Sequence, residues 1–194
     1  GVRSSGFSRF LVPLAAKMKT LQNPFAPWAL EQERFPANSK RPQIVPLLTF
    51  LLQTWARREG TGQVFDSSTG FILPNGATRS PDVAWVRNDR LARISDEQWE
   101  KFLPLCPDFV LELRSPSDRL QVVQQKMEEY RQNGAHLGWL LDAPRKRVQV
   151  YRPDAPPELL ENPLALSGDP VLQGFGLDVR QIWAAMVRKS RPSD

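Results

Sequence analysis

Hydrophobic side chains recur at the three- and four-residue spacing of a helix in three stretches of the chain. The first stretch covers residues 43–59 and places on one face Ile44, Leu47, Leu48, Leu51, Leu52 and Trp55. The second covers about residues 117–133 and carries the stripe Leu120, Val123, Met127 and Tyr130. The third follows Asp178 and carries the stripe Val179, Ile182, Trp183 and Met186. Three amphipathic helices are therefore predicted.

Polar and small residues mark where these helices begin and end. Gly60 and Gly134 follow the first two stripes, in the position where glycine often ends a helix. Ser117 or Asp118 is placed to cap the start of the second helix, and Asp178 the start of the third. The first helix should begin close to Pro46, because proline is tolerated only near the first turn.

Between the helices the pattern changes to a period of two, which is typical of strands. In residues 109–114, Phe109, Leu111 and Leu113 alternate with Val110, Glu112 and Arg114, and Pro116 ends the run. Similar runs predict two short strands in residues 63–73 around a turn, and further strands at 82–86, 137–141, 147–151 and near 159–160. Residues 88–103 carry mixed charges and are predicted to form a surface helix or covering segment.

Composition narrows the class of protein. A length of 194 residues with 41% apolar residues predicts one core domain, over residues 43–187. Residues 1–42, rich in proline and without a period, predict a poorly defined N-terminal arm, and residues 188–194 a basic tail. One cysteine and one histidine exclude a disulfide framework and cysteine-based zinc sites, so a cytoplasmic protein is expected. No apolar run is long enough to predict a membrane span, and the net charge of +5 favours an anionic partner.

Two carboxylates stand in apolar strands, where an unpaired charge would be costly. Glu112 lies in the middle of its strand, and either Arg114, two residues on and on the same side, pairs with it, or it faces a metal or a water-filled cleft. Asp82 follows Pro81 at the start of the next strand upstream, and is either a solvated turn residue or a second member of a site. Lys126 lies at the edge of the second helical stripe, where its amine either snorkels to solvent or reaches a cleft beside the sheet.

Taken in order, these segments resemble the PD-(D/E)XK nuclease superfamily. The chain is most similar to a restriction endonuclease branch long classed as a domain of unknown function. The matching phrases lie within residues 61–184 and comprise residues 65–71, 79–86, 106–118 with the motif ELRSPSD, 126–130, 138–142 and 148–153. This resemblance implies an α/β (α+β) fold with a restriction-endonuclease-like core, in which a mixed central β-sheet is flanked by helices.

The resemblance also implies roles for particular residues. Asp82 and Glu112 would hold Mg²⁺, with Mn²⁺ as a substitute, and Lys126 would supply the catalytic amine. The superfamily lysine two residues after the glutamate is replaced here by Arg114, which would orient Glu112 or contact phosphate. Gln125 and Glu128 are nearby substitutes, and Glu33 is the nearest match to an acidic group upstream of the first core helix, where the branch's motif is otherwise absent.

The function expected from these residues is a Mg²⁺-dependent endonuclease that hydrolyses phosphodiester bonds in DNA. Cutting both strands would favour a homodimer. The alternative is a catalytically inactive nuclease-fold protein that binds DNA or serves as an assembly module. A third hypothesis is a hydrolase that uses Asp82 and Glu112 as an acid/base pair without metal.

Overall fold

A computed structural model describes residues 41–186 of the 194-residue chain. Its helices and strands are, in chain order, α2 (Arg41–Glu59), β1 (Gly62–Asp66), β2 (Phe71–Ile72), β3 (Thr78–Arg79), β4 (Val83–Arg87), α3 (Asn88–Leu91), α4 (Asp96–Trp99), β5 (Phe109–Leu113), α5 (Leu120–Gln132), β6 (Leu137–Asp142), η2 (Ala143–Arg145), β7 (Arg147–Arg152), β8 (Ala155–Glu161), β9 (Ala165–Ser167), β10 (Gly176–Asp178) and α6 (Arg180–Met186). The predicted basic tail and all but the end of the predicted arm lie outside the described residues.

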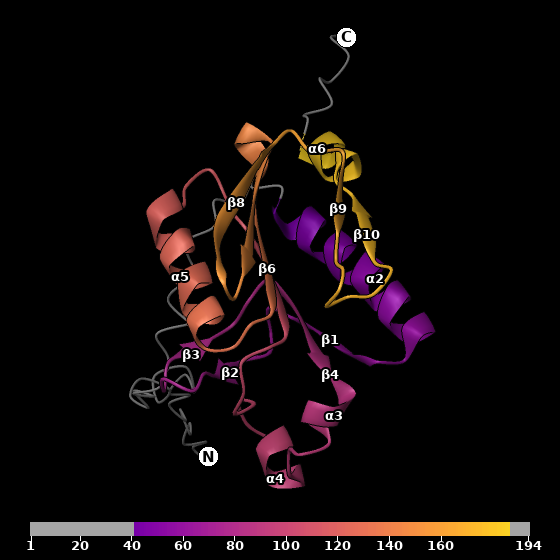
Figure 1. Ribbon diagram of the computed structural model, residues 1–194, viewed down its shortest axis with the longest axis vertical. Coiled ribbons are helices and arrows are strands. Elements are labelled where there is room, and N and C mark those ends of the chain that lie inside the picture. The colour runs from indigo at the N-terminus through magenta and orange to yellow at the C-terminus, as the bar shows by residue number, and fades with distance from the viewer. Residues whose placement is uncertain (1–40, 187–194) are drawn as a thin grey trace, which may run out of the picture. The chain divides into compact units, whose positions relative to one another are not determined.

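Six strands form one mixed sheet in the order β1-β4-β5-β6-β7-β8. β5 and β6 run parallel, while the other neighbours are antiparallel. A parallel pair needs a crossover connection, and α5 supplies it. Figure 1 shows α5 on one side of the sheet and α2 with α6 on the other. The predicted class, α/β (α+β) with a mixed central sheet flanked by helices, is confirmed.

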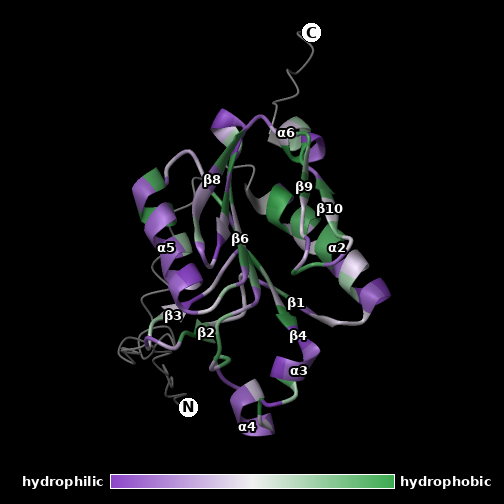
Figure 2. Ribbon diagram, in the orientation of Figure 1, coloured by the Kyte–Doolittle hydropathy of each residue, from purple (hydrophilic) through white to green (hydrophobic). Residues whose placement is uncertain are grey.

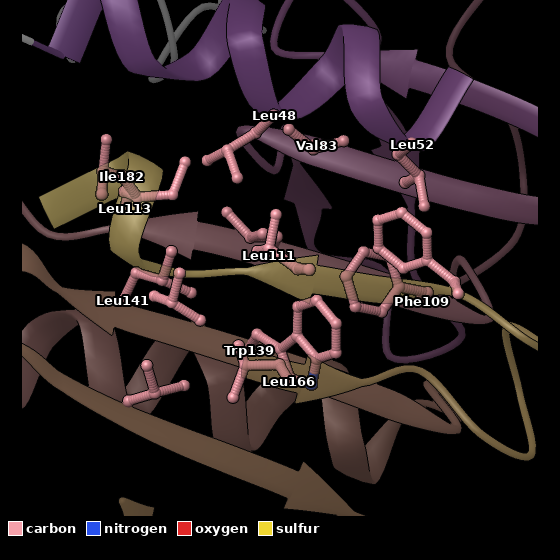
Figure 3. Close-up of a cluster of buried hydrophobic side chains, with 14 of the residues drawn as sticks. Leu48, Leu52, Val83, Phe109, Leu111, Leu113, Trp139, Leu141, Leu166 and Ile182 are labelled. Carbon is pink, nitrogen blue, oxygen red and sulfur yellow. The ribbon is translucent and has the colours of Figure 1, made fainter. Parts of the chain in front are cut away.

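One hydrophobic core lies between α2 and the sheet. The first hydrophobic stripe is stable as a helix because its apolar side chains are buried in this core. Leu48 and Leu52 point from α2 toward Val83, Leu111 and neighbouring side chains of β4, β5 and β6 (Figure 3). Every residue of β5 and β6 is buried, because helices cover both faces of the central strands.

The second core lies between the sheet and α5. Met127 and Tyr130 of α5 pack with Val110 and Leu140 of the central strands. A Cβ at Gly138 would lie 2.6 Å from the terminal methyl group of Met127, so glycine lets the helix approach β6 closely. In Figure 2, α5 is coloured mainly as hydrophilic, whereas much of α2 is coloured as hydrophobic. The predicted apolar stripe of α5 is therefore the helix's contact with the sheet.

The ends of several elements differ from those expected. α2 begins at Arg41 and contains Pro46 in its second turn rather than close to its start. The segment 88–103 forms two short helices, α3 and α4, instead of one. The two strands expected in 63–73 do not pair with each other, because β1 pairs with β4 while β2 pairs with β3 across the turn at residues 73–77.

The start of α5 also departs from the expectation. The helix begins at Leu120 with Arg119 in the cap position and no capping hydrogen bond from its side chain. Asp118 instead accepts a hydrogen bond from the Ser115 N–H at 2.8 Å, which closes the turn that leaves the sheet. The carboxylate expected to cap α5 therefore stabilises the preceding turn.

The C-terminal third contains more strand than predicted. β8 extends over seven residues along β7, and β9 and β10 form a separate hairpin before α6. Asp178 accepts a hydrogen bond from the Arg180 N–H at 3.0 Å, in line with its predicted place at the start of the last helix. Within residues 41–186, no helix combines the length and apolar character needed to cross a membrane.

Candidate active site

Asp82 directly precedes β4, and Glu112 lies in the neighbouring strand β5. The antiparallel register pairs Val83 with Leu111, so a ladder continued by one residue would pair Asp82 with Glu112. In a regular ladder such partners share one face, with Cβ atoms about 4.5–5.5 Å apart. That face is the one covered by α5, because Ala84 and Val110 belong to the core beneath that helix. Both carboxylates are 97% buried, since only 3% of each residue is exposed.

Asp82 is held by the strand it faces. Its Oδ2 accepts a hydrogen bond from the backbone N–H of Leu113 at 2.7 Å. The side chain thereby continues the β4–β5 ladder beyond the first residue of β4. This bond fixes Asp82 beside the end of β5, next to the residue that follows Glu112.

Lys126 reaches the same place from α5. Its Nζ lies 2.8 Å from Glu112 Oε1 and donates to the Ser80 carbonyl at 3.3 Å. The lysine side chain is 19% exposed, so its amine is not directed freely into solvent as a snorkelling lysine would be. The two predicted carboxylates and the predicted lysine are therefore brought together.

Tyr130 adds a fourth group that the sequence did not indicate. It lies one turn after Lys126, is fully buried, and donates its hydroxyl to Glu112 Oε1 at 3.3 Å. Burial, and then the charge of Glu112, raises the pKa of Tyr130 well above its ordinary value, so the phenol stays protonated. The four-residue spacing from Lys126 is the signal that could have identified it, because such residues share a helical face.

The segment leading into Asp82 is fixed to α5 by a second set of polar contacts. Arg79 Nε donates to Glu129 Oε2 at 2.5 Å, and Asn75 Nδ2 donates to Glu129 Oε1 at 3.0 Å. The β2–β3 turn and the strand before Asp82 are thus both held by one glutamate of the helix.

Arg114 pairs with Asp142 rather than with the glutamate two residues before it. Its Nη1 lies 2.8 Å from Asp142 Oδ1, and its Nε donates to the Asp118 carbonyl at 3.1 Å. Arg145 binds the other oxygen of Asp142 at 3.1 Å. The register explains this, because the ladder that pairs Leu113 with Leu141 places Arg114 beside Asp142.

The remaining candidate residues lie away from this cluster or outside the described residues. Gln125 is exposed on α5. Glu128 binds Arg131 on the helix surface, and that hydrogen bond lowers the pKa of Glu128. Glu33 belongs to residues that the structure does not describe.

Asp108 is a third buried carboxylate, at the other end of β5, and its contacts are structural. The residue has no exposed surface, and its carboxylate accepts from the Arg87 N–H at 3.0 Å. Arg90 and His136 approach its Oδ1 at 3.0 and 3.2 Å. Asp108 therefore ties α3 and the loop before β6 to the start of β5.

We expect Asp108→Ala to lower the free energy of unfolding by about 3–5 kcal/mol, because the groups that bind Asp108 then lack a negatively charged partner. Urea denaturation measures this change. Asp89→Ala, which removes an exposed partner of Arg87, is the control and should change stability much less. Equal effects of the two substitutions would contradict the structural role of Asp108.

The donor set at Asp82 and Glu112 fits Mg²⁺. This ion is commonly bound through one or two carboxylates, with water and substrate phosphate filling its other positions. Within the described part of the chain, no three His, Cys, Asp or Glu side chains gather as a metal-binding group. Two acidic oxygen donors without imidazole or thiolate are the chemistry of a hard cation rather than of a zinc site.

Comparisons with known proteins agree with this fold. The family model described as "Uma2: Putative restriction endonuclease" matches residues 35–180, more than half of the chain. The crystal structure of a "putative nuclease belonging to DUF820" from Anabaena variabilis ATCC 29413 is similar with a TM-score of 0.65 and 20% identity, covering 76% of this chain and 82% of that chain. At this identity the likeness shows the fold alone.

No curated protein matches the chain. The resemblance to the restriction endonuclease branch of the PD-(D/E)XK superfamily is nevertheless confirmed by the family match, which also supports a nuclease-like function. The chain therefore belongs to the Uma2 family.

Proposed function

We propose that this protein is a Mg²⁺-dependent endonuclease that hydrolyses phosphodiester bonds in DNA. The observation that carries the proposal is one cluster: a buried carboxylate just before β4 that binds the backbone of β5, a second buried carboxylate in β5, and a lysine amine 2.8 Å from the second. Burying two carboxylates close together is unfavourable unless positive charge balances them. Lys126 supplies one positive charge, and the carboxylate oxygens can bind a metal ion that would supply more.

Each residue has a separate task in this reaction. Asp82 and Glu112 would hold the ion, which when bound supplies a Lewis acid for a phosphate oxygen and lowers the pKa of an attacking water. The Lys126 amine, which lies 2.8 Å from Glu112 Oε1, would donate to the negative charge that develops on the phosphate. The Leu113 N–H keeps Asp82 in place throughout.

DNA is the proposed substrate because two arginines are fixed near the end of β5, the strand that carries Glu112. Arg114 is two residues beyond Glu112 and is held in place by the buried Asp142, which also holds Arg145. Anchored guanidinium groups bind phosphate oxygens with little further loss of side-chain freedom. A net charge of +5 favours association with the same polyanion. Cleavage of both strands would require two sites, which a symmetric dimer supplies.

Nicking of supercoiled plasmid DNA tests the proposal. We expect cleavage with Mg²⁺, its loss with EDTA, and its recovery when Mg²⁺ or Mn²⁺ is added in excess. Binding of DNA that weakens steeply with salt, without cleavage at any concentration of either ion, would instead identify an inactive nuclease fold. Cleavage that survives the chelator would point to the carboxylate pair acting without metal.

A further inference from the structure

The hydroxyl of Tyr130 is the least expected polar group in the core beneath α5. The residue belongs to an apolar stripe in which phenylalanine would fill the same volume, yet it places an oxygen in a fully buried position. Burying a hydroxyl is unfavourable unless it forms a hydrogen bond. The charged neighbours that act on this hydroxyl are Glu112, Arg79 and Asp82, so it lies within the candidate site.

Two donors from one helix converge on one oxygen of Glu112. Lys126 Nζ lies 2.8 Å from Oε1, and the Tyr130 hydroxyl lies 3.3 Å from the same atom. The donors are four residues apart on α5, so a single helical face presents both. Because the two oxygens belong to one rigid carboxylate, holding Oε1 against α5 restricts the directions in which Oε2 can point.

We propose that Tyr130 is a positioning residue that fixes the carboxylate of Glu112 for metal binding. The inference rests on the proposed function, because it assigns Glu112 to the metal. Tyr130 touches neither DNA nor the reacting atoms, and it acts only through Glu112.

The two donors on Oε1 differ in charge, and this gives them different effects. The ammonium of Lys126 neutralises Glu112 and competes with a metal ion for the same negative charge. The hydroxyl of Tyr130 orients Glu112 without adding a positive charge. When the Lys126 amine turns toward a phosphate, Tyr130 still holds Oε1, so the ligand keeps its orientation during the reaction.

Calorimetric titration of Mn²⁺ into the full chain without DNA tests this role. Tyr130→Phe removes one oxygen atom and should weaken metal binding about 10- to 100-fold, the usual effect of losing a hydrogen bond to a metal ligand. Tyr151→Phe is the matched control, because Tyr151 is the other tyrosine, its residue is buried, and its hydroxyl donates to Gln149 at 2.8 Å. This control should bind Mn²⁺ like the parent.

The outcomes separate this inference from the proposed function. If the parent and Tyr130→Phe bind Mn²⁺ equally, Tyr130 does not position Glu112, while the metal site stands. If the parent binds no metal, the proposed function fails and the inference fails with it. A thermal melt of each variant identifies any loss of binding that comes from unfolding.

Two further measurements test the role of Tyr130 if Tyr130→Phe has a lower melting temperature than the parent. In cleavage assays, this variant should need about tenfold or more Mg²⁺ for half-maximal rate, with KM for DNA unchanged and most of kcat recovered at saturating Mg²⁺. In a Lys126→Met background, where the amine contact to Oε1 is lost and the Tyr130 hydroxyl is kept, Tyr130→Phe should weaken Mn²⁺ binding by a larger factor than in the parent. A fall in kcat that saturating Mg²⁺ does not restore, or identical factors in the two backgrounds, would overturn the positioning role.

Discussion

Asp82→Asn is expected to abolish both metal binding and DNA cleavage while leaving the fold intact. Asparagine keeps an oxygen that can accept the Leu113 N–H, so the end of the β4–β5 ladder is preserved. It removes a negative charge that the proposed metal site requires. We expect plasmid nicking to fall by at least about a thousandfold, which corresponds to about 4 kcal/mol of transition-state stabilisation. Initial rates of nicking at saturating Mg²⁺ and calorimetric titration with Mn²⁺ measure the two effects.

Asp108→Asn is the matched control for that experiment. Like Asp82→Asn, this substitution neutralises a buried carboxylate. Asp108 directly precedes β5 and so lies at the opposite end of that strand from Glu112. The control should lose stability and still bind Mn²⁺ and nick plasmid below its melting temperature. Cleavage by Asp82→Asn at the parental rate would remove Asp82 from the site, and equal losses in both variants would reduce the effect to unfolding.

Much of the fold could be predicted because its patterns are local. The stripe in residues 43–59 and the alternation in 109–113 each describe how one element meets the core, and both elements formed. The β9–β10 hairpin was missed because three-residue strands are too short to show a period, and their pairing joins segments about ten residues apart. The early start of α2 was missed because Pro46 was expected close to the first turn.

The same difference between local patterns and contacts between distant segments applies to the candidate site. The apolar patterns drew attention to Asp82, Glu112 and Lys126 as charged residues, and the resemblance to the PD-(D/E)XK superfamily assigned them to one site. The sequence could not decide whether Glu112 pairs with Arg114 or faces a metal or a water-filled cleft. The register between β5 and β6 gives Arg114 to Asp142, a residue 28 positions away. Tyr130 was assigned to the core because an apolar stripe does not reveal where a hydroxyl points.

Lys126→Met is expected to abolish cleavage and, at the same time, to strengthen metal binding. Methionine keeps most of the length of the side chain and removes the charge that lies 2.8 Å from Glu112. Without that ammonium group, the two carboxylates attract a divalent cation more strongly, and we expect Mn²⁺ affinity to rise severalfold. The developing charge on the phosphate then lacks its donor, and we expect cleavage to fall by about a hundredfold or more. The same titration and nicking assays report the opposite signs.

Arg114→Met provides the comparison that decides which basic residue serves the reaction. Arg114 is bound to Asp142 and to the Asp118 carbonyl, so its loss should lower stability and weaken DNA binding, with a smaller effect on kcat at saturating DNA than that of Lys126→Met. The reverse ranking would return the catalytic cation to the position two residues after Glu112. A variant with stronger metal binding and no cleavage cannot have lost its fold or its carboxylates. The paired result for Lys126→Met therefore identifies a group that is needed after the metal has bound. This is the role proposed for the Lys126 amine, which lies beside the metal-binding carboxylates.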